Sequence, residues 1–167
     1  TAQAALAGAT RSILLNSCVT ILPLQNPILH AKALATADWM SGGRMVVTFG
    51  LGSIRKEYEY FGVPWEERGA IADEYLEAII ALWTQERPSF EGQYVKFNDI
   101  GFNPKPVQIP HLPIWIGGNS KPALRRVARF GVFLFAAELR NEAGHRVGVH
   151  AQEPRRPAFV PARSPQR

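Results

Sequence analysis

Short apolar runs alternate along this chain with longer segments whose apolar residues recur at helical spacing. The runs at residues 13–22, 44–50 and 114–116 have the length and composition of buried strands. The segments at 28–40 and 67–83, and the stretch that ends before Gly131, place their apolar residues on one helical face. A further strand is expected at 132–136. Because parallel strands need a crossover connection, this alternation predicts a parallel α/β architecture.

The remaining segments are shorter or less regular. Residues 1–9 are Ala-rich and are interpreted as the last turns of a helix that stops at Gly8, and 55–62 as a short helix. Between residues 87 and 111 the pattern predicts a tight hairpin at 90–94 and an extended connector at 103–106. This insertion is longer than the usual loop between a helix and the next strand.

A glycine pair follows the strand at 114–116. Gly117 and Gly118 allow backbone N–H groups to approach a ligand, and Asn119 or Ser120 can cap the helix that follows. A helix start supplies unpaired N–H donors and a partial positive charge. The segment Gly117–Ser120 therefore predicts an anion site, while a purely structural turn would use the same residues equally well.

Ligands of parallel α/β folds bind at the carboxyl ends of the strands. In this chain those ends are Thr20–Asn26, Gly50–Ser53 and Gly117–Ser120. A set of large apolar strand residues is expected to lie on the inner face of the sheet, which is turned away from the helices. These side chains are expected to stay uncovered. That set is Ile21, Val47, Phe49, Ile114 and Ile116.

Composition narrows the function classes. The 167 residues are 46% hydrophobic and 20% charged, as in ordinary globular domains. No apolar run approaches the roughly 18 residues of a membrane helix, and no signal peptide is evident, so no membrane association and a cytoplasmic location are predicted. The single Cys18 and the four histidines show no ligand spacing, so no metal site is predicted.

The net charge of +5 comes mostly from the end of the chain. Residues 132–167 contain six Arg and three Glu, which leaves thirteen basic and eleven acidic residues in 1–131. The body therefore lacks a basic stripe, and nucleic-acid binding is not predicted. Residues 137–167 are expected to form a disordered Arg/Pro-rich tail after a domain at 1–136.

A series of short motifs, in order along about residues 2–131, resembles the bacterial luciferase-like monooxygenase family, and in particular its coenzyme F-420 (deazaflavin)-dependent oxidoreductases. The blocks that carry this resemblance are Leu22–Pro27, Ala31–Thr36, Ser41–Arg44, Gly50–Gly52, Phe61–Pro64, Arg68–Gly69, Phe90–Gly92, Asn103–Gln108 and Pro113–Ser120. The resemblance implies a TIM (β/α)8 barrel that binds its cofactor at the strand ends. It implies that only the central βα units of that barrel are present here.

The resemblance also implies site residues. Thr20 and Asn26 match positions beside the ring and side chain of the deazaflavin, and Gly117, Gly118, Asn119 and Ser120 match the segment that receives its phosphate. Asn26 is equally an expected helix cap. The implied reaction is hydride transfer between coenzyme F-420 and a small organic substrate, with FMN-dependent monooxygenation as the alternative, in a homo-oligomer.

The catalytic residues themselves are unknown. The resemblance places the acid or histidine near the reactive ring carbon, and the nonprolyl cis peptide that supports the ring, before Thr1. Similarity fades after Gly131, which suggests a frame change or a truncated gene. The isolated chain is therefore expected to be inactive, and a noncatalytic barrel remnant that acts only by association is the alternative of another class.

Overall fold

The structure is a computed structural model of the chain, and it describes residues 2–131 and 133–135. In chain order the elements are α1 (Ala2–Ala9), β1 (Leu15–Ile21), the 3-10 turn η1 (Leu22–Leu24), α2 (Pro27–Ser41), β2 (Met45–Gly50), α3 (Arg55–Phe61), α4 (Arg68–Thr84), β3 (Phe90–Glu91), β4 (Lys96–Phe97), β5 (Ile114–Gly117), α5 (Lys121–Phe130) and β6 (Phe133–Phe135). The strands and helices expected from periodicity are confirmed, with ends displaced by one or two residues. The expected disorder of 137–167 lies outside the described residues.

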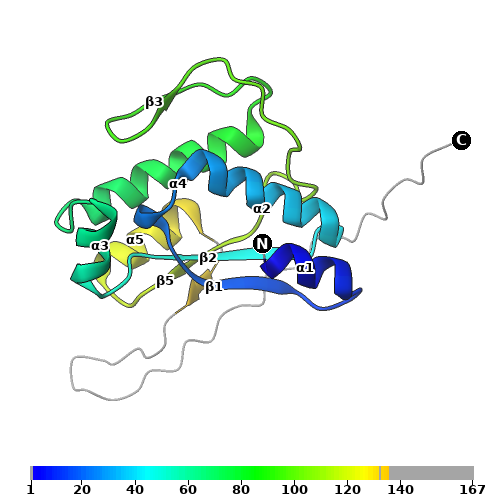
Figure 1. Cartoon of the computed structure of the whole chain (residues 1–167), viewed down its shortest axis with the longest axis horizontal. Coiled ribbons are helices and arrows are strands. Elements are labelled where there is room, and N and C mark those ends of the chain that lie inside the picture. The colour runs from blue at the N-terminus through cyan, green and yellow to red at the C-terminus, as the bar shows by residue number, and fades with distance from the viewer. Residues whose placement is uncertain (1, 132, 136–167) are drawn as a thin grey trace, which may run out of the picture.

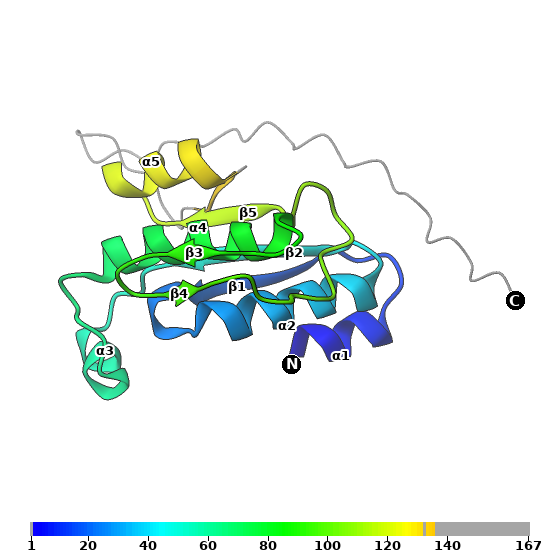
Figure 2. The same cartoon turned by 90° about the horizontal axis from the view of Figure 1, so that it is seen from above.

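The long strands form one parallel sheet in the order β1-β2-β5-β6. Helices α1, α2, α4 and α5 contact one another in sequence along one side of this sheet (Figures 1 and 2). The α/β class with a parallel sheet is thus confirmed. No helix within 2–131 is long and apolar enough to span a bilayer.

The core lies between the helices and one face of the sheet. Val47, Phe49, Ile114 and Ile116 are almost fully buried there, in one cluster with residues of α2 and α4. The expectation that these four point away from the helices is therefore wrong. Every residue of β2 is buried, so hydrophobic and polar residues do not alternate along this strand. The hydrophobic pattern alone therefore could not distinguish its two faces.

The beginning of the first strand also differs from expectation. Ile13 and Leu14 are exposed and precede β1, while Cys18 and Val19 within the strand are exposed as well. Only part of the apolar run at 13–22 is thus a core strand, because some of its hydrophobic residues are buried in the core and others are exposed to solvent.

Buried polar side chains hold the connections in place. The Asp38 carboxylate on α2 accepts hydrogen bonds from the backbone N–H of Val107 (2.8 Å) and from the backbone N–H and the side-chain Nε2 of Gln108. Desolvation by burial raises the pKa of Asp38, and these hydrogen bonds oppose that effect. Asp38 thereby fixes the connector that leads into β5.

Arg44, which follows α2 and is half-buried, holds a second set of connections in place. Its guanidinium donates to the carbonyl oxygens of Ala7, Thr10 and Ile13 at 2.9 to 3.1 Å and to that of Ser41 at 2.7 Å. These carbonyls include ones that the end of α1 leaves without a helical partner. One side chain therefore joins α1, the turn before β1 and the end of α2.

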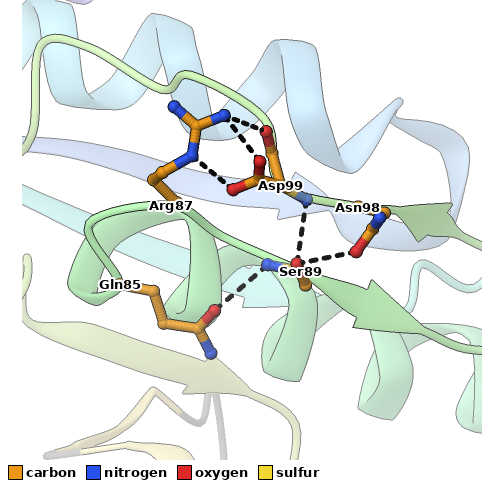
Figure 3. A network of polar contacts seen from close by, with 5 residues as sticks. All are labelled: Gln85, Arg87, Ser89, Asn98 and Asp99. Carbon is orange, nitrogen blue, oxygen red and sulfur yellow. Dashed lines mark hydrogen bonds and ion pairs between the residues drawn. The ribbon is translucent and has the colours of Figure 1, made fainter.

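The insertion between α4 and β5 forms the two-stranded hairpin β3–β4. Arg87 forms a bidentate ion pair with Asp99, and Ser89 donates to Asn98 and accepts from the Asp99 N–H (Figure 3). At the turn, the Glu74 carboxylate on α4 accepts hydrogen bonds from the N–H groups of Gln93, Tyr94 and Val95. The predicted hairpin is confirmed, and it lies against α4 (Figure 1).

His30 on α2 gives the core a measurable pH dependence. Its ring is 6.0 Å from that of Phe49, and in the described structure its buried Nε2 has no hydrogen-bond partner. Burial lowers the pKa of His30 from 6.5. The unfolded chain therefore takes up the proton first, so stability is complete above pH 6.5 and falls as the pH drops below it.

We predict that His30→Leu removes this part of the pH dependence. Wild type should lose more free energy of unfolding than His30→Leu between pH 7.5 and 5.5, at a rate of at most about 1.4 kcal/mol per pH unit for one group. Urea denaturation at the two pH values measures the difference. Identical losses in both proteins would contradict a buried neutral histidine.

Candidate functional site

The carboxyl ends of β1, β2 and β5 lie at one edge of the sheet. Thr20 is the register partner of Phe49, and Phe49 is the partner of Ile116. This pairing brings the segments that follow the three strands together, as the sequence predicts. A small cavity at this edge is lined by Leu22, Leu51, Leu76, Gly117 and Arg126.

An irregularity in β1 shapes this edge. The register shifts between Ser17 and Thr20, and the peptide bond between Cys18 and Val19 is cis. The prediction that the nonprolyl cis peptide precedes Thr1 is therefore wrong. Nothing in the residue types at this position distinguishes it from regular strand.

The half-exposed Val19 side chain lies over two glycines of neighbouring strands. A Cβ built on Gly50 would be 2.6 Å from Val19 Cγ2, which is closer than real Cβ atoms come, and one built on Gly117 would be 3.6 Å away. The missing side chain of Gly50 therefore makes room for Val19. The result is a half-exposed apolar surface formed by Val19, next to the Gly117–Gly118 turn.

A polar pair lies on strand residues before the irregularity. The Thr48 hydroxyl donates to Asn16 Oδ1 at 2.9 Å, and Thr48 is fully buried. Thr48 is the register partner of Trp115, whose neighbours Ile114 and Ile116 belong to the helix-facing core. Alternation places Thr48 and Trp115 on the opposite face. This pair joins β1 to β2, and no motif or spacing in the sequence indicates it.

The Gly117–Ser120 turn has the features predicted for an anion site. Gly118 has φ +125°, a conformation that side-chain-bearing residues rarely adopt, and a Cβ there would be 3.3 Å from Ala123 Cβ. Ser120 is the N-cap of α5, and its hydroxyl accepts from the N–H of Ala123 at 3.4 Å. Gly118, Asn119 and Ser120 are exposed, so an anion could reach their backbone.

Asn26 is a helix cap in this structure. Its Oδ1 accepts hydrogen bonds from the N–H groups of Ile28 and Leu29 at 3.1 and 3.0 Å. The capping alternative is thus confirmed, and the side chain is exposed with its Nδ2 group still able to donate. A contact between Asn26 and a cofactor remains a prediction.

Thr20 is half-buried, and its hydroxyl donates to Ser17 Oγ at 3.2 Å. Its register partner Phe49 points into the helix-facing core. Thr20 therefore serves the backbone irregularity of β1, and its role beside a cofactor remains a prediction.

Arg126 is a positioning residue that composition alone would assign to the surface. It is buried, and its guanidinium pairs with Asp73 (Nε to Oδ1, 2.6 Å) and donates to the Gly69 carbonyl at 3.0 Å. Because Asp73 and Gly69 belong to α4, this contact fixes α5, and with it the Gly117–Ser120 turn, relative to the neighbouring helix. Burial of an arginine without a partner is costly, so its position in the fold is well defined.

Comparison with known proteins agrees with this geometry. The family model of the luciferase-like monooxygenases matches residues 1–161, and the chain belongs to this family. The chain is similar to the FMNH2-dependent dimethylsulfone monooxygenase of Pseudomonas putida, with 38% identity over 113 residues that cover 66% of this chain and 31% of that protein. It is also similar to an uncharacterised protein of Mycobacterium bovis, with 43% identity over 65% of this chain and 38% of that protein.

Solved structures show the same fold. The monooxygenase RslO1 of Streptomyces bottropensis superposes with a TM-score of 0.71 at 31% identity, over 75% of this chain and 38% of that one. The coenzyme F420 dependent tetrahydromethanopterin reductase of Methanopyrus kandleri gives a TM-score of 0.71 at 21% identity, over 83% and 44% of the two chains. The chain thus spans about a third of the length of the curated relatives named above.

The contact of Val19 with Gly50 can be tested by substitution. We predict that Gly50→Ala destabilises the protein by about 1 to 3 kcal/mol, because the new methyl group overlaps Val19. In a Val19→Ala background the same substitution should cost much less. Chemical denaturation of the single and double variants measures this coupling.

Gly101→Ala is the matched control, since a Cβ there meets nothing within 4 Å. It should change stability by no more than about 0.5 kcal/mol. An equal cost of Gly50→Ala with and without Val19 would show that the two residues do not determine each other's position.

Proposed function

We propose that this chain carries the phosphate-binding and ring-supporting part of a flavin-type cofactor site, in an oxidoreductase that transfers a hydride between coenzyme F-420 and a small organic substrate. The observation that supports it most is the exposed Gly117–Ser120 turn at the start of α5, beside the Val19 surface. We further propose that the described sheet is an incomplete (β/α)8 barrel made of central βα units, closed by strands outside the described residues. The activity is thus proposed for an assembled barrel.

The residues present fit such a cofactor. Gly117 and Gly118 leave open the space that side chains would fill, and the exposed turn offers backbone N–H donors and the Ser120 hydroxyl to a phosphate. The apolar Val19 suits the face of a tricyclic ring. Lys121 and Arg125 are exposed on the same helix and add positive charge near the proposed phosphate.

Each group has a distinct role in this proposal. When bound, the deazaflavin supplies the hydride chemistry. The Gly117–Ser120 turn binds the phosphate, Val19 orients the ring, and Arg126 holds the turn in position. The Asn26 amide donates to the cofactor through Nδ2 while its oxygen caps α2.

An FMN-dependent monooxygenase is the second candidate. It is favoured by the 38% identity to an enzyme named as FMNH2-dependent. FMN also has a tricyclic ring and a phosphate, so the same residues would bind both. The two affinities can be compared directly by titrating the purified chain with each cofactor and measuring the saturable quenching of the cofactor's fluorescence.

A noncatalytic barrel remnant is the alternative of another class. It would associate with other chains but show no saturable quenching with either cofactor. Saturable binding without turnover by the chain alone would support the proposal, because an incomplete site can hold a cofactor that it cannot use.

The phosphate assignment predicts the effect of Gly118→Val. A side chain at φ +125° strains the turn and fills the place where the backbone meets the anion, so affinity should fall at least tenfold. Gly62→Val is the matched control, because Gly62 also has a positive φ (+66°) but lies at the end of α3. It should lower stability without lowering the affinity of the folded protein.

Ser120→Ala should weaken binding by about 10-fold to 150-fold, since one hydrogen bond to a charged group contributes about 1.5 to 3 kcal/mol. Fluorescence titration gives both affinities. Unchanged affinity in both Gly118→Val and Ser120→Ala would refute the phosphate site.

The two roles of Asn26 can be separated by Asn26→Ser. Serine caps a helix about as well as asparagine but has no Nδ2 group. We therefore expect Asn26→Ser to keep the melting temperature and to weaken cofactor binding, whereas Asn26→Ala lowers both. If Asn26→Ser binds as tightly as wild type, the residue is only a cap.

A further inference from the structure

A groove lies between α4 and α5, which are neighbouring helices on the same side of the sheet (Figures 1 and 2). It has a volume of about 270 Å³, and most of the residues that line it are charged. We name it the α4–α5 groove, and its lining residues are Asp73, Pro122, Arg125, Arg126, Arg129 and Phe130. Three arginines and one aspartate give this lining a net positive charge.

The charge of α5 is only partly neutralised by its neighbours. The helix contains no acidic residue and four basic ones, namely Lys121, Arg125, Arg126 and Arg129. On α4, Asp73 pairs with Arg126 at 2.6 Å. Glu77 pairs with Arg129 at 2.7 Å. Lys121 and Arg125 form no ion pair with any residue that the structure describes, so two positive charges remain on this helix.

This excess charge is unfavourable for α5 itself. Lys121, Arg125 and Arg129 follow one another at four-residue spacing, at which like charges repel. Lys121 is also the first residue of the helix, where the positive end of the helix dipole disfavours a cation. Lys121 and Arg125 are exposed and lie outside the core, so the fold does not require their charge. A bound anion would relieve this repulsion.

The buried Arg126 adds a hydrogen-bond donor to the groove. Its Nε and Nη2 donate to the Asp73 carboxylate, and Nη2 also donates to the Gly69 carbonyl. Its Nη1 makes no hydrogen bond within the described part of the chain, although the residue is only 8% exposed. Leaving a donor of a buried charged group without a partner is costly. Because Arg126 lines the groove, its Nη1 group is suited to bind a ligand there.

We propose that the α4–α5 groove is a binding site for an oxyanion, that is, a phosphate or carboxylate group. Arg125 and Arg129 bind it from the exposed rim, and the buried Arg126 binds it from within. Guanidinium groups suit this role because their planar N–H donors match the geometry of phosphate and carboxylate oxygens. The site is distinct from the Gly117–Ser120 turn, since its donors are side chains, and it does not depend on a bound cofactor.

The oxyanion has two possible sources with the same chemistry. One is an acidic group that a cofactor carries beyond the phosphate held by the turn, since the groove begins at Pro122, two residues after Ser120. The other is a separate small molecule with phosphate or carboxylate groups. Both would use the same arginines, so the experiment has to separate them.

Calorimetric titration of the full chain with inorganic pyrophosphate, at constant ionic strength, tests the site. Wild type should bind saturably, and Arg125→Gln and Arg129→Gln should each weaken binding at least tenfold. Arg125→Lys should weaken it less than Arg125→Gln, because it keeps the charge. Lys56→Gln is the matched control: it removes one exposed positive charge from α3, outside the groove, and should leave the affinity unchanged. Near-ultraviolet circular dichroism checks that each variant is folded.

Two further measurements separate this site from the turn and identify the source. Gly118→Val should retain pyrophosphate binding even where it loses the cofactor. If Arg125→Gln also weakens cofactor binding, the oxyanion belongs to the cofactor; if cofactor affinity is unchanged, it belongs to a separate molecule. The inference is overturned if wild type shows no saturable binding, or if Lys56→Gln weakens it as much as the arginine variants. Binding that is lost in Gly118→Val and kept in Arg125→Gln overturns it as well, because the anion would then be at the turn.

Discussion

The packing of Val19 over Gly50 determines the geometry of the strand ends. Since a Cβ on Gly50 would be 2.6 Å from Val19 Cγ2 but 3.9 Å from Val19 Cβ, β2 must end in glycine as long as β1 carries a branched side chain such as valine at this point. The shift in register between Ser17 and Thr20 brings Val19 to this position, and the hydrogen bond from Thr48 to Asn16 joins the same two strands before the shift. The candidate site is therefore a property of two strands acting together.

Buried and half-buried polar groups connect the elements of the fold to one another. Arg126 joins α5 to α4, Asp38 joins α2 to the connector before β5, and Arg44 joins α1 to α2. A charged group that leaves water loses its hydration, and this loss must be compensated by hydrogen bonds within the protein. Each of these three side chains makes several such hydrogen bonds. Loss of any one partner would leave a charge or a set of backbone groups unsatisfied, so these contacts specify the arrangement of the helices as well as stabilising it.

Local signals made most of the fold predictable. The caps at Asn26 and Ser120 are determined by residue type next to the helix, and α2 and α5 begin where those residues indicate. The turn at Gly117–Gly118 was predictable for the same reason. The faces of the strands were not, because Val47 and Ile114 lie in a sheet where both faces bury apolar residues.

Contacts between residues far apart in the sequence could not be predicted from the sequence pattern either. Arg126 and Asp73 are 53 positions apart, and Asp38 and Val107 are 69 apart, so neither pair shares a local periodicity. The exposure of Trp39 could not be predicted either. Tryptophan is usually a core or interface residue, and only the structure shows that this one is exposed.

The candidate site depends on backbone more than on side chains. A phosphate held by N–H groups at a helix start needs glycines for access and a cap for the helix, but no particular charged residue. Such a site makes no distinction between two cofactors that share a phosphate and a tricyclic ring. In the proposed function, the choice between hydride transfer and oxygen activation therefore falls to side chains that face the reacting part of the ring, and the proposed roles of the Gly117–Ser120 turn and Val19 are compatible with either chemistry.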